Sequence, residues 1–249
     1  MHPLTATGAA IADEADLVAL LAGDAPDIDG TRSWVTTNMV MTLDGAYADQ
    51  GRSGGISSDA DHRLFIANRS LADAILVGAS TARAERYRRP RVGEAAAEVR
   101  RLRGQEPEPR VVMTSRRLGL PPDLGLLDGR DPRPILAHPL DVDTSGAPEG
   151  VELLAVGQGS VDFSELLGRL ARRGMRRIVC EGGPGILGQL AEADLIDEFL
   201  LTLSPRLVGG DDVGLLSGAR PDAATFALHR AHVAEDHLML AYRRTRRER

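Results

Sequence analysis

The stretch from residue 177 to residue 188 constrains the fold more than any other part of the chain. It reads RIVCEGGPGILG, an apolar run that ends in an acid, followed by a glycine turn and a second apolar run. Free backbone N–H groups and the dipole at a helix start bind phosphate, and glycine lets the anion come close. The pattern predicts a strand, loop and helix that seat a phosphorylated ligand, although a plain tight strand-to-helix connection has the same signature.

The position of this loop separates two kinds of nucleotide-binding sheet. Residues 183–188 match Gly-x-Gly-x-x-Gly, the fingerprint of doubly wound dinucleotide-binding folds, where the loop follows the first strand. Here about three quarters of the chain precedes the loop, and one short helix and strand-like runs follow it. The placement disfavours a conventional doubly wound dehydrogenase and favours a different nucleotide-binding sheet.

Periodicity and turn signals predict a mixed sheet covered by helices. Strands are expected at residues 34–41, 74–77, 110–113, 134–137, 151–156, 178–181 and 198–203, with a β-hairpin at 225–243. Helices are expected at 11–21, 95–102 and 163–172, after the glycine loop, and after Ser57 or Ser58, where Leu64, Phe65 and Leu71 would be buried. Residues 1–30 are interpreted as a lead-in segment and residues 31–249 as one α/β domain, for which 43% hydrophobic residues suffice.

Composition excludes several kinds of chemistry. All 30 basic residues are arginine, so the chain has no lysine for a Schiff base, for pyridoxal phosphate or for a Walker loop. Cys180 is the single cysteine, which excludes an internal disulfide and a Cys-rich zinc site, and its apolar surroundings predict a buried, inert thiol. His62 lies beside Asp59 and Asp61, but helix-capping acids explain this group better than a ligand set, and no metal is expected.

Charge and hydropathy limit the kinds of partner that the protein is expected to have. The net charge of −6 predicts no general attraction to nucleic acid or to anionic membranes. The start of the chain lacks the pattern of a signal peptide and no apolar run reaches membrane-spanning length, so a soluble cytoplasmic protein is expected. The basic run at residues 86–89 is a local exception that is suited to face a phosphate.

Small or hydroxyl residues follow three of the predicted strands, at residues 78–81, 114–115 and 182–183. Ligands of open α/β sheets bind at the carboxyl ends of the strands, so these three ends together could hold a dinucleotide. Arg83 and Arg116 come close behind two of them, and arginine clamps phosphate with two parallel hydrogen bonds. The arrangement therefore suits a dinucleotide that carries an extra phosphate.

Six motifs in order resemble the reductase domain of the bacterial riboflavin-pathway deaminase-reductase and, more distantly, dihydrofolate reductase. They are MTLDG at 41–45, ADAILVGAST at 72–81, VVMTS at 111–115, EGGP at 181–184, DLIDE at 194–198 and LSPRLVGG at 203–210. The resemblance runs from about residue 32 to the end of the chain. It implies a dihydrofolate-reductase-like mixed β-sheet flanked by helices, in a homodimer. The implied reaction is hydride transfer from NADPH to the ribosyl carbon of an aminopyrimidine ribosylamine phosphate.

The resemblance also implies site residues. Those expected to bind NADPH are Met41, Gly55, Gly78, Thr81 and Glu85, with Thr114, Ser115 and Arg116 at the adenosine 2′-phosphate and Gly182, Gly183, Pro184, Gly185, Ile186, Leu187, Gly188 and Gln189 around the pyrophosphate. Ser53, Arg69 and Glu181 fall at substrate positions, although a solvated helix residue explains Arg69 equally well. Glu181 has the stronger claim, because folding alone poorly explains a carboxylate that closes an apolar strand. Glu181 and Asp44 are the catalytic candidates, with Asp44 expected to handle a proton or to orient a group, unless Asp44-Gly45 is only a turn.

Departures from the family pattern keep several functions open. Asn38 replaces the usual lysine, Gly55-Ile56 replaces Trp-Ile, and residues 85–89 replace Asp-Asp-Pro-x-Leu. The zinc-ligand pattern of the deaminase is missing, so a stand-alone reductase is expected. The leading hypothesis is an NADPH-dependent reductase of the 5-amino-6-(5-phosphoribosylamino)uracil type. The alternatives are a dihydrofolate or pterin reductase and a non-catalytic NADPH-binding homologue.

Overall fold

The computed structural model describes residues 13–28, 30–210, 213–222 and 224–245. The strands are β1 (Trp34–Thr42), β2 (Ala74–Gly78), β3 (Arg110–Thr114), β4 (Ile135–His138), β5 (Glu152–Ala155), β6 (Arg177–Cys180), β7 (Glu198–Ser204), β8 (Phe226–Ala234) and β9 (His237–Arg244). The helices are α1 (Glu14–Gly23), α2 (Asp59–Leu71), α3 (Ala79–Ala84), α4 (Glu94–Leu102), α5 (Phe163–Arg172) and α6 (Pro184–Glu192), with a 3₁₀ turn at Ser53–Gly55. Each predicted strand and helix has a counterpart among them, and residues 11–12 of the first predicted helix lie outside the described residues.

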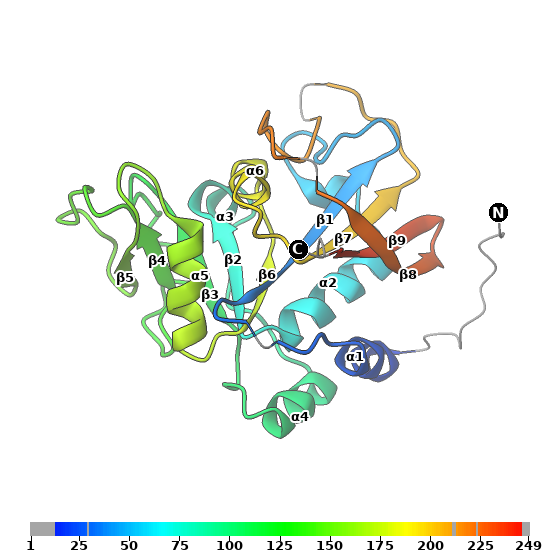
Figure 1. Cartoon of the computed structure of the whole chain (residues 1–249), viewed down its shortest axis with the longest axis horizontal. Helices are drawn as coiled ribbons and strands as arrows, with labels where there is room; N and C mark the ends of the chain where they lie inside the picture. Colours follow the sequence, from blue (N-terminus) through cyan, green and yellow to red (C-terminus); the bar gives the residue numbers. More distant parts are fainter. Residues whose placement is uncertain (1–12, 29, 211–212, 223, 246–249) are drawn as a thin grey trace.

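The described strands form one nine-stranded mixed sheet in the order β5-β4-β3-β2-β6-β1-β7-β9-β8 (Figure 1). The strands from β5 to β7 pair in parallel, and β9 pairs antiparallel with both β7 and β8. Every residue of β2 and β4 is buried, as expected for strands with both faces covered, whereas β7 alternates between buried and half-buried residues. The predicted mixed sheet with a C-terminal hairpin is confirmed.

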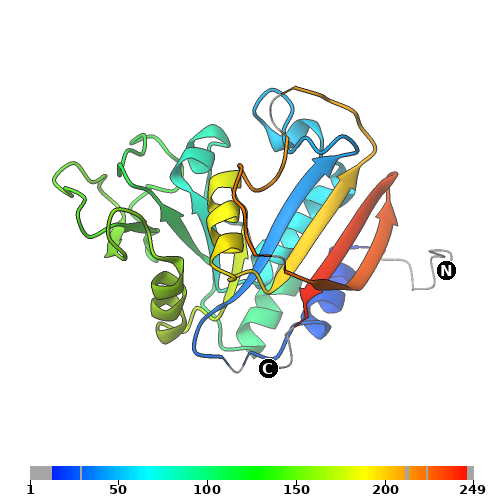
Figure 2. The same cartoon turned by 45° about the horizontal axis from the view of Figure 1, so that its top comes forward.

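Helices cover both faces of the sheet (Figures 1 and 2). On one face, α5 and α6 bury Leu166, Leu170 and Leu187 in the largest hydrophobic cluster. On the other, α2 packs with α1 and α4 through a cluster that includes Leu17 and Leu71. Cys180 is fully buried, which raises the pKa of its thiol to about 12, as expected for an inert cysteine. No helix in the described ranges combines the length and apolarity that crossing a bilayer requires.

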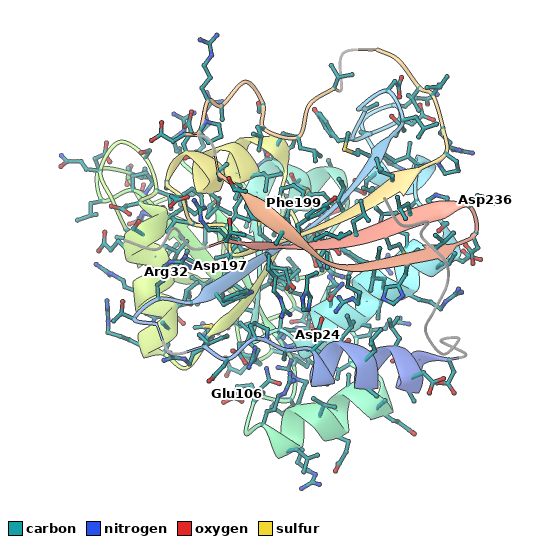
Figure 3. The ribbon with its side chains drawn as sticks, turned by 45° about the vertical axis from the view of Figure 1, so that its right-hand side comes forward. Asp24, Arg32, Glu106, Asp197, Phe199 and Asp236 are labelled. Atoms are coloured by element: carbon teal, nitrogen blue, oxygen red, sulfur yellow. The ribbon has the colours of Figure 1, made fainter. Side chains whose placement is uncertain are left out.

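Ion pairs connect Arg32 with the residue before β7, and the end of α1 with strand β8 (Figure 3). Arg32, just before β1, donates to both carboxylate oxygens of Asp197 at 2.7 and 2.8 Å. Asp24, at the end of α1, accepts a hydrogen bond from Arg230 and lies 2.6 Å from Nε2 of His229. The described part of the predicted lead-in is therefore packed against the domain.

The carboxyl ends of β3, β2 and β6 meet at one edge of the sheet. β2 pairs in parallel with both neighbours, so that Gly78 lies opposite Thr114 and Leu76 opposite Cys180. The small and hydroxyl residues that follow these strands are therefore neighbours, as the sequence predicted. This edge carries the candidate site.

Candidate active site

A cleft of about 660 Å³ opens at this edge of the sheet, beside α2 and the loop before α6. It brings together seven residues that the sequence placed at substrate or cofactor positions: Ser53, Arg69, Thr81, Glu85, Glu181, Gly183 and Pro184. Predicted substrate residues and predicted cofactor residues thus line one continuous space. A reaction that transfers a hydride directly between two bound molecules needs this arrangement.

Arg69, Tyr87 and Glu181 form a compact cluster in the cleft. Nε and Nη2 of Arg69 donate to the two carboxylate oxygens of Glu181 at 2.6 and 3.0 Å, and the hydroxyl of Tyr87 donates to Oε2 of Glu181. The side chains of Arg69 and Glu181 are 13% and 2% exposed. Arg69 is therefore a partner of Glu181 within the cleft, and its interpretation as a solvated helix residue was wrong.

Two aromatic rings contact the Arg69 guanidinium. Its central carbon lies 4.6 Å from the centre of the Phe65 ring and 5.1 Å from that of Tyr87, distances that allow cation–π attraction. Burial alone would lower the pKa of Arg69, but the charges and hydrogen bonds of Glu181 and Tyr87 together outweigh it and the pKa is raised. Burial and Glu181 together raise the pKa of Tyr87 well above its usual value, so its hydroxyl remains a donor.

The glycine loop is fastened to the connection between β2 and α3. The N–H of Gly183 donates to Oγ1 of Thr81 at 2.9 Å, and the N–H of Gly78 donates to the carbonyl of Gly182 at 2.8 Å. The peptide between Gly182 and Gly183 is cis, and Gly182 has φ +81°. A Cβ on Gly183 would lie 2.7 Å from Oγ1 of Thr81, so this position has room only for glycine.

The start of α6 is open to a ligand. Gly183 caps the helix without a side-chain hydrogen bond, and a Cβ on the exposed Gly185 would meet no atom within 4 Å. Gly183, Ile186 and Leu187 already donate their N–H groups and Pro184 has none, so the N–H of Gly185 is the one in this first turn that remains for an anion. Ile186 and Leu187 point into the core, and a Cβ on Gly188 would lie 2.5 Å from the carbonyl oxygen of Leu216, so these three residues pack the helix.

Other predicted cofactor residues lie outside the cleft lining. The carbonyl of Gly55 accepts a hydrogen bond from Arg206, and Met41 is half-buried near the end of β1. Gln189 donates to the carbonyl of Gly185 at 2.9 Å. Thr114, Ser115 and Arg116 follow β3 at the same sheet edge as Gly78 and Gly182, and Arg116 is exposed. A ligand that contacts all of them must extend out of the cleft and across the strand ends.

Asp44 stabilises a loop beyond the cleft. Its carboxylate accepts hydrogen bonds from the Thr42 hydroxyl and from the N–H groups of Val208 and Gly209, the latter two at 3.1 and 2.6 Å. These bonds, that of Thr42 most of all, lower the pKa of Asp44 below its usual value. The geometry favours the orienting alternative for Asp44 over proton handling.

Sequence reasoning did not assign several lining residues to the site, among them Asp61, Phe65 and Tyr87. Ser58 caps α2 and Asp61 lies in its first turn, as predicted, but the place of Asp61 in the cleft was not foreseen. Phe65 was expected to be buried and is half-buried in the cleft wall. Asp61, Phe65 and Arg69 recur every fourth residue, and this spacing on one helix face was the signal that could have found them. Tyr87 was hidden in a basic run.

Comparisons with known proteins place the chain in a family. A family model described as the RibD C-terminal domain matches residues 33–238. The 2,5-diamino-6-ribosylamino-4(3H)-pyrimidinone 5′-phosphate reductase of Archaeoglobus fulgidus is 32% identical over 193 residues, which cover 73% of this chain and 84% of that protein. The protein of the same name from Methanothermobacter thermautotrophicus is 30% identical over 223 residues, 85% of this chain and 98% of the relative.

A solved structure has the same fold. A pyrimidine reductase-like protein from Corynebacterium diphtheriae superposes with a TM-score of 0.77 at 21% identity, covering 92% of this chain and 99% of that one. At this identity the likeness concerns the fold alone. It confirms the predicted α/β class, a mixed sheet flanked by helices.

Proposed function

Because this chain belongs to the family of RibD C-terminal domains, we propose that it is an NADPH-dependent reductase of the riboflavin pathway. The proposed substrate is a ribosylaminopyrimidine 5′-phosphate, and the diaminopyrimidinone in the names of the two relatives is preferred over the uracil. One observation carries the proposal: the cluster of Arg69, Tyr87 and Glu181 shares a cleft with the glycine loop before α6.

The residues at the strand ends suit NADPH. The uncapped start of α6 and the open surface of Gly185 leave room for a pyrophosphate, with Thr81 holding the loop in place. Arg116 is exposed on the neighbouring strand end, where it is suited to bind a 2′-phosphate. Bound NADPH would supply the hydride.

The protein side chains would position the substrate and stabilise charge. Reduction of the ribosylamine breaks the bond between the ribosyl carbon C1′ and its ring oxygen, with a hydride added to C1′ and a proton to that oxygen. Arg69 and Tyr87 hold the Glu181 carboxylate in one orientation, and a fixed negative charge stabilises the positive character of a carbon about to accept a hydride. We assign this role to Glu181, with Ser53 as a further substrate contact.

The substrate phosphate needs cations other than Arg69. Two of the N–H donors of Arg69 are already engaged by Glu181. Arg86 and Arg88 also line the cleft, are exposed, and form no ion pair within the described part of the chain. We assign the 5′-phosphate to these two arginines.

The homodimer implied by the resemblance and the cytoplasmic location expected from the sequence remain predictions. One feature supports the homodimer: the edge strand β8 exposes Leu228 and Val233, at 50% and 70%. An unpaired edge with apolar side chains is suited to contact a second copy. Sedimentation of the purified protein would test this.

Thermal unfolding in the presence of NADPH or NADH tests the proposed cofactor first. A ligand that binds only the folded protein adds about 2.7 kcal/mol to its stability at a hundred times its dissociation constant. We expect stabilisation by NADPH and less by NADH, and then NADPH oxidation with the diaminopyrimidinone substrate. Binding without turnover would identify a non-catalytic homologue, turnover of dihydrofolate a folate reductase, and equal stabilisation by NADH would contradict the assignment of Arg116.

A further inference from the structure

Asp61 is a buried carboxylate that lines the cleft without a neutralising cation. Its residue is 8% exposed, and the Ser57 hydroxyl donates to Oδ2 at 2.6 Å. Among the residues that the structure describes, none forms an ion pair with Asp61, and no other group donates to its carboxylate. Oδ1 therefore remains available for a ligand.

Folding alone explains such a carboxylate poorly. Burying a carboxylate without a cation beside it is unfavourable, and the position of Asp61 in the first turn of α2 offsets only part of that cost. The cap of α2 is already supplied by Ser58, whose Oγ accepts from the N–H of Asp61 at 3.2 Å. A buried carboxylate in a cleft with an unused acceptor oxygen points to a ligand that supplies N–H donors.

The other carboxylates of the cleft are less available to a ligand. Both oxygens of Glu181 already accept hydrogen bonds from Arg69, and one of them also accepts from Tyr87. Glu85 is exposed and accepts from the N–H and hydroxyl of Ser53, both at 3.4 Å. Asp61 is thus the buried acid of the described cleft that has unused acceptor capacity.

An aromatic ring lies one helical turn from Asp61. Phe65 lines the same cleft, and His62 stacks on it with ring centres 6.1 Å apart. Side chains four residues apart on a helix are neighbours, so the acceptor and the Phe65 ring, which already contacts the Arg69 guanidinium, belong to one wall of the cleft. This pair matches a planar heterocycle whose edge carries N–H groups.

We propose that Asp61 determines substrate specificity by accepting hydrogen bonds from the ring N–H and the C2 amino group of a 2-amino-4-oxopyrimidine. The proposal rests on the proposed function and deepens it. A uracil has a carbonyl oxygen at C2, which would face the carboxylate with no hydrogen between the two acceptors. A site built to hydrogen-bond a donor rejects the analogue that lacks it. The chain therefore distinguishes the diaminopyrimidinone from the uracil through this one side chain.

Steady-state kinetics with two ribosylaminopyrimidine 5′-phosphates that differ only at C2 test the proposal. The wild-type protein should have the higher kcat/KM for the 2-amino compound. Asp61→Asn should lower that value about 10- to 100-fold, mainly through KM, because a charged hydrogen bond is lost, and should not lower the value for the uracil. An unchanged ratio of the two values in Asp61→Asn, or an equal loss for both substrates, would overturn the proposal.

Asp59→Asn is the matched control, because Asp59 is an exposed acid in the same first turn of α2 and lies outside the cleft lining. It should leave the substrate ratio unchanged, and the dissociation constant for NADPH should be unchanged in both variants. If Asp61→Asn does not fold, Ser57→Ala replaces it, since it removes the bond that orients the carboxylate and should weaken the preference severalfold. An unchanged preference in Ser57→Ala would then overturn the proposal.

Equilibrium binding separates this proposal from the proposed function. If the wild-type protein turns over neither phosphate, the proposed function has failed, and titration with the free bases 2,6-diaminopyrimidin-4-one and 6-aminouracil decides the role of Asp61. Tighter binding of the diamino base that is lost in Asp61→Asn would support the proposal. Equal binding of the two bases by the wild-type protein would overturn it.

Discussion

The ion pair between Arg69 and Glu181 allows a quantitative prediction for Glu181→Gln. Glutamine keeps the shape and one acceptor, but it leaves the Arg69 guanidinium charged, 13% exposed and without its countercharge. Breaking a buried ion pair by removing one partner costs about 3–5 kcal/mol. We expect about 3 kcal/mol, the lower limit, because the cleft admits some water to Arg69. In a chain of this size each kcal/mol lowers Tm by about 2–4 °C, so Tm should fall by about 6–12 °C.

A double-mutant cycle assigns this loss to the pair. Unfolding in urea would be measured for the wild type, Glu181→Gln, Arg69→Met and the double variant. The double variant should lose less than the sum of the single losses, because removing both charges leaves no unpaired ion in the cleft. Tyr87→Phe is the control for a single neutral donor, and it should cost about 1 kcal/mol. A loss below about 1 kcal/mol in Glu181→Gln, or strictly additive losses, would refute the claim that the charges are coupled.

Three further substitutions test the cofactor side of the site and Asp44. Gly185→Ala should leave the folded protein as stable or more stable, since alanine favours a helix by about 1 kcal/mol, but it should weaken NADPH binding. Gly183→Ala, in contrast, should lower Tm because the added Cβ crowds Thr81. Equal NADPH affinity in Gly185→Ala and wild type would contradict the proposed phosphate position. Arg116→Ala should reduce the preference for NADPH over NADH about tenfold or more. Arg117→Ala is the control, because Arg117 is similarly exposed. An unchanged preference in Arg116→Ala would refute the contact between Arg116 and the 2′-phosphate. Asp44→Asn should leave the acid limb of the kcat–pH profile unchanged, because the lowered pKa keeps this carboxylate ionised at neutral pH; loss of that limb would restore a proton-handling role.

The sheet and its ligand-binding edge could be predicted because they follow from local patterns. Apolar runs such as residues 74–77 specify buried parallel strands, and the residues that follow each strand specify what meets at the carboxyl edge. The segment before α6 combined an apolar strand with the small residues that follow it. Its late position in the chain disfavoured the doubly wound dehydrogenase fold.

The interior of the cleft could not be predicted in the same way, because its bonds join residues far apart in the chain. Glu181 is 112 residues from Arg69 and 94 residues from Tyr87, and propensity carries no information about such pairs. Phe65 and Asp61 have ordinary roles in an amphipathic helix, as a core residue and a first-turn acid. Only the packing of α2 beside the cleft assigns them to the site.

Asp44 illustrates the opposite difficulty. A motif that resembles a catalytic segment drew attention to the carboxylate, but three hydrogen bonds to Thr42, Val208 and Gly209 account for it. The loop that contains residues 208 and 209 is distant in sequence and has no marked periodicity. Its contact with Asp44 is a tertiary feature that sequence alone does not specify.

Transfer of an isotopic label tests the central claim most directly. The purified protein would be incubated with the diaminopyrimidinone ribosylamine phosphate and with NADPH that carries deuterium at the transferable position of the nicotinamide. If the cleft holds cofactor and substrate together, the product gains one deuterium at C1′ of the ribityl chain, and Asp61→Asn slows its formation. NADPH that is bound but transfers no label to this substrate would contradict the account.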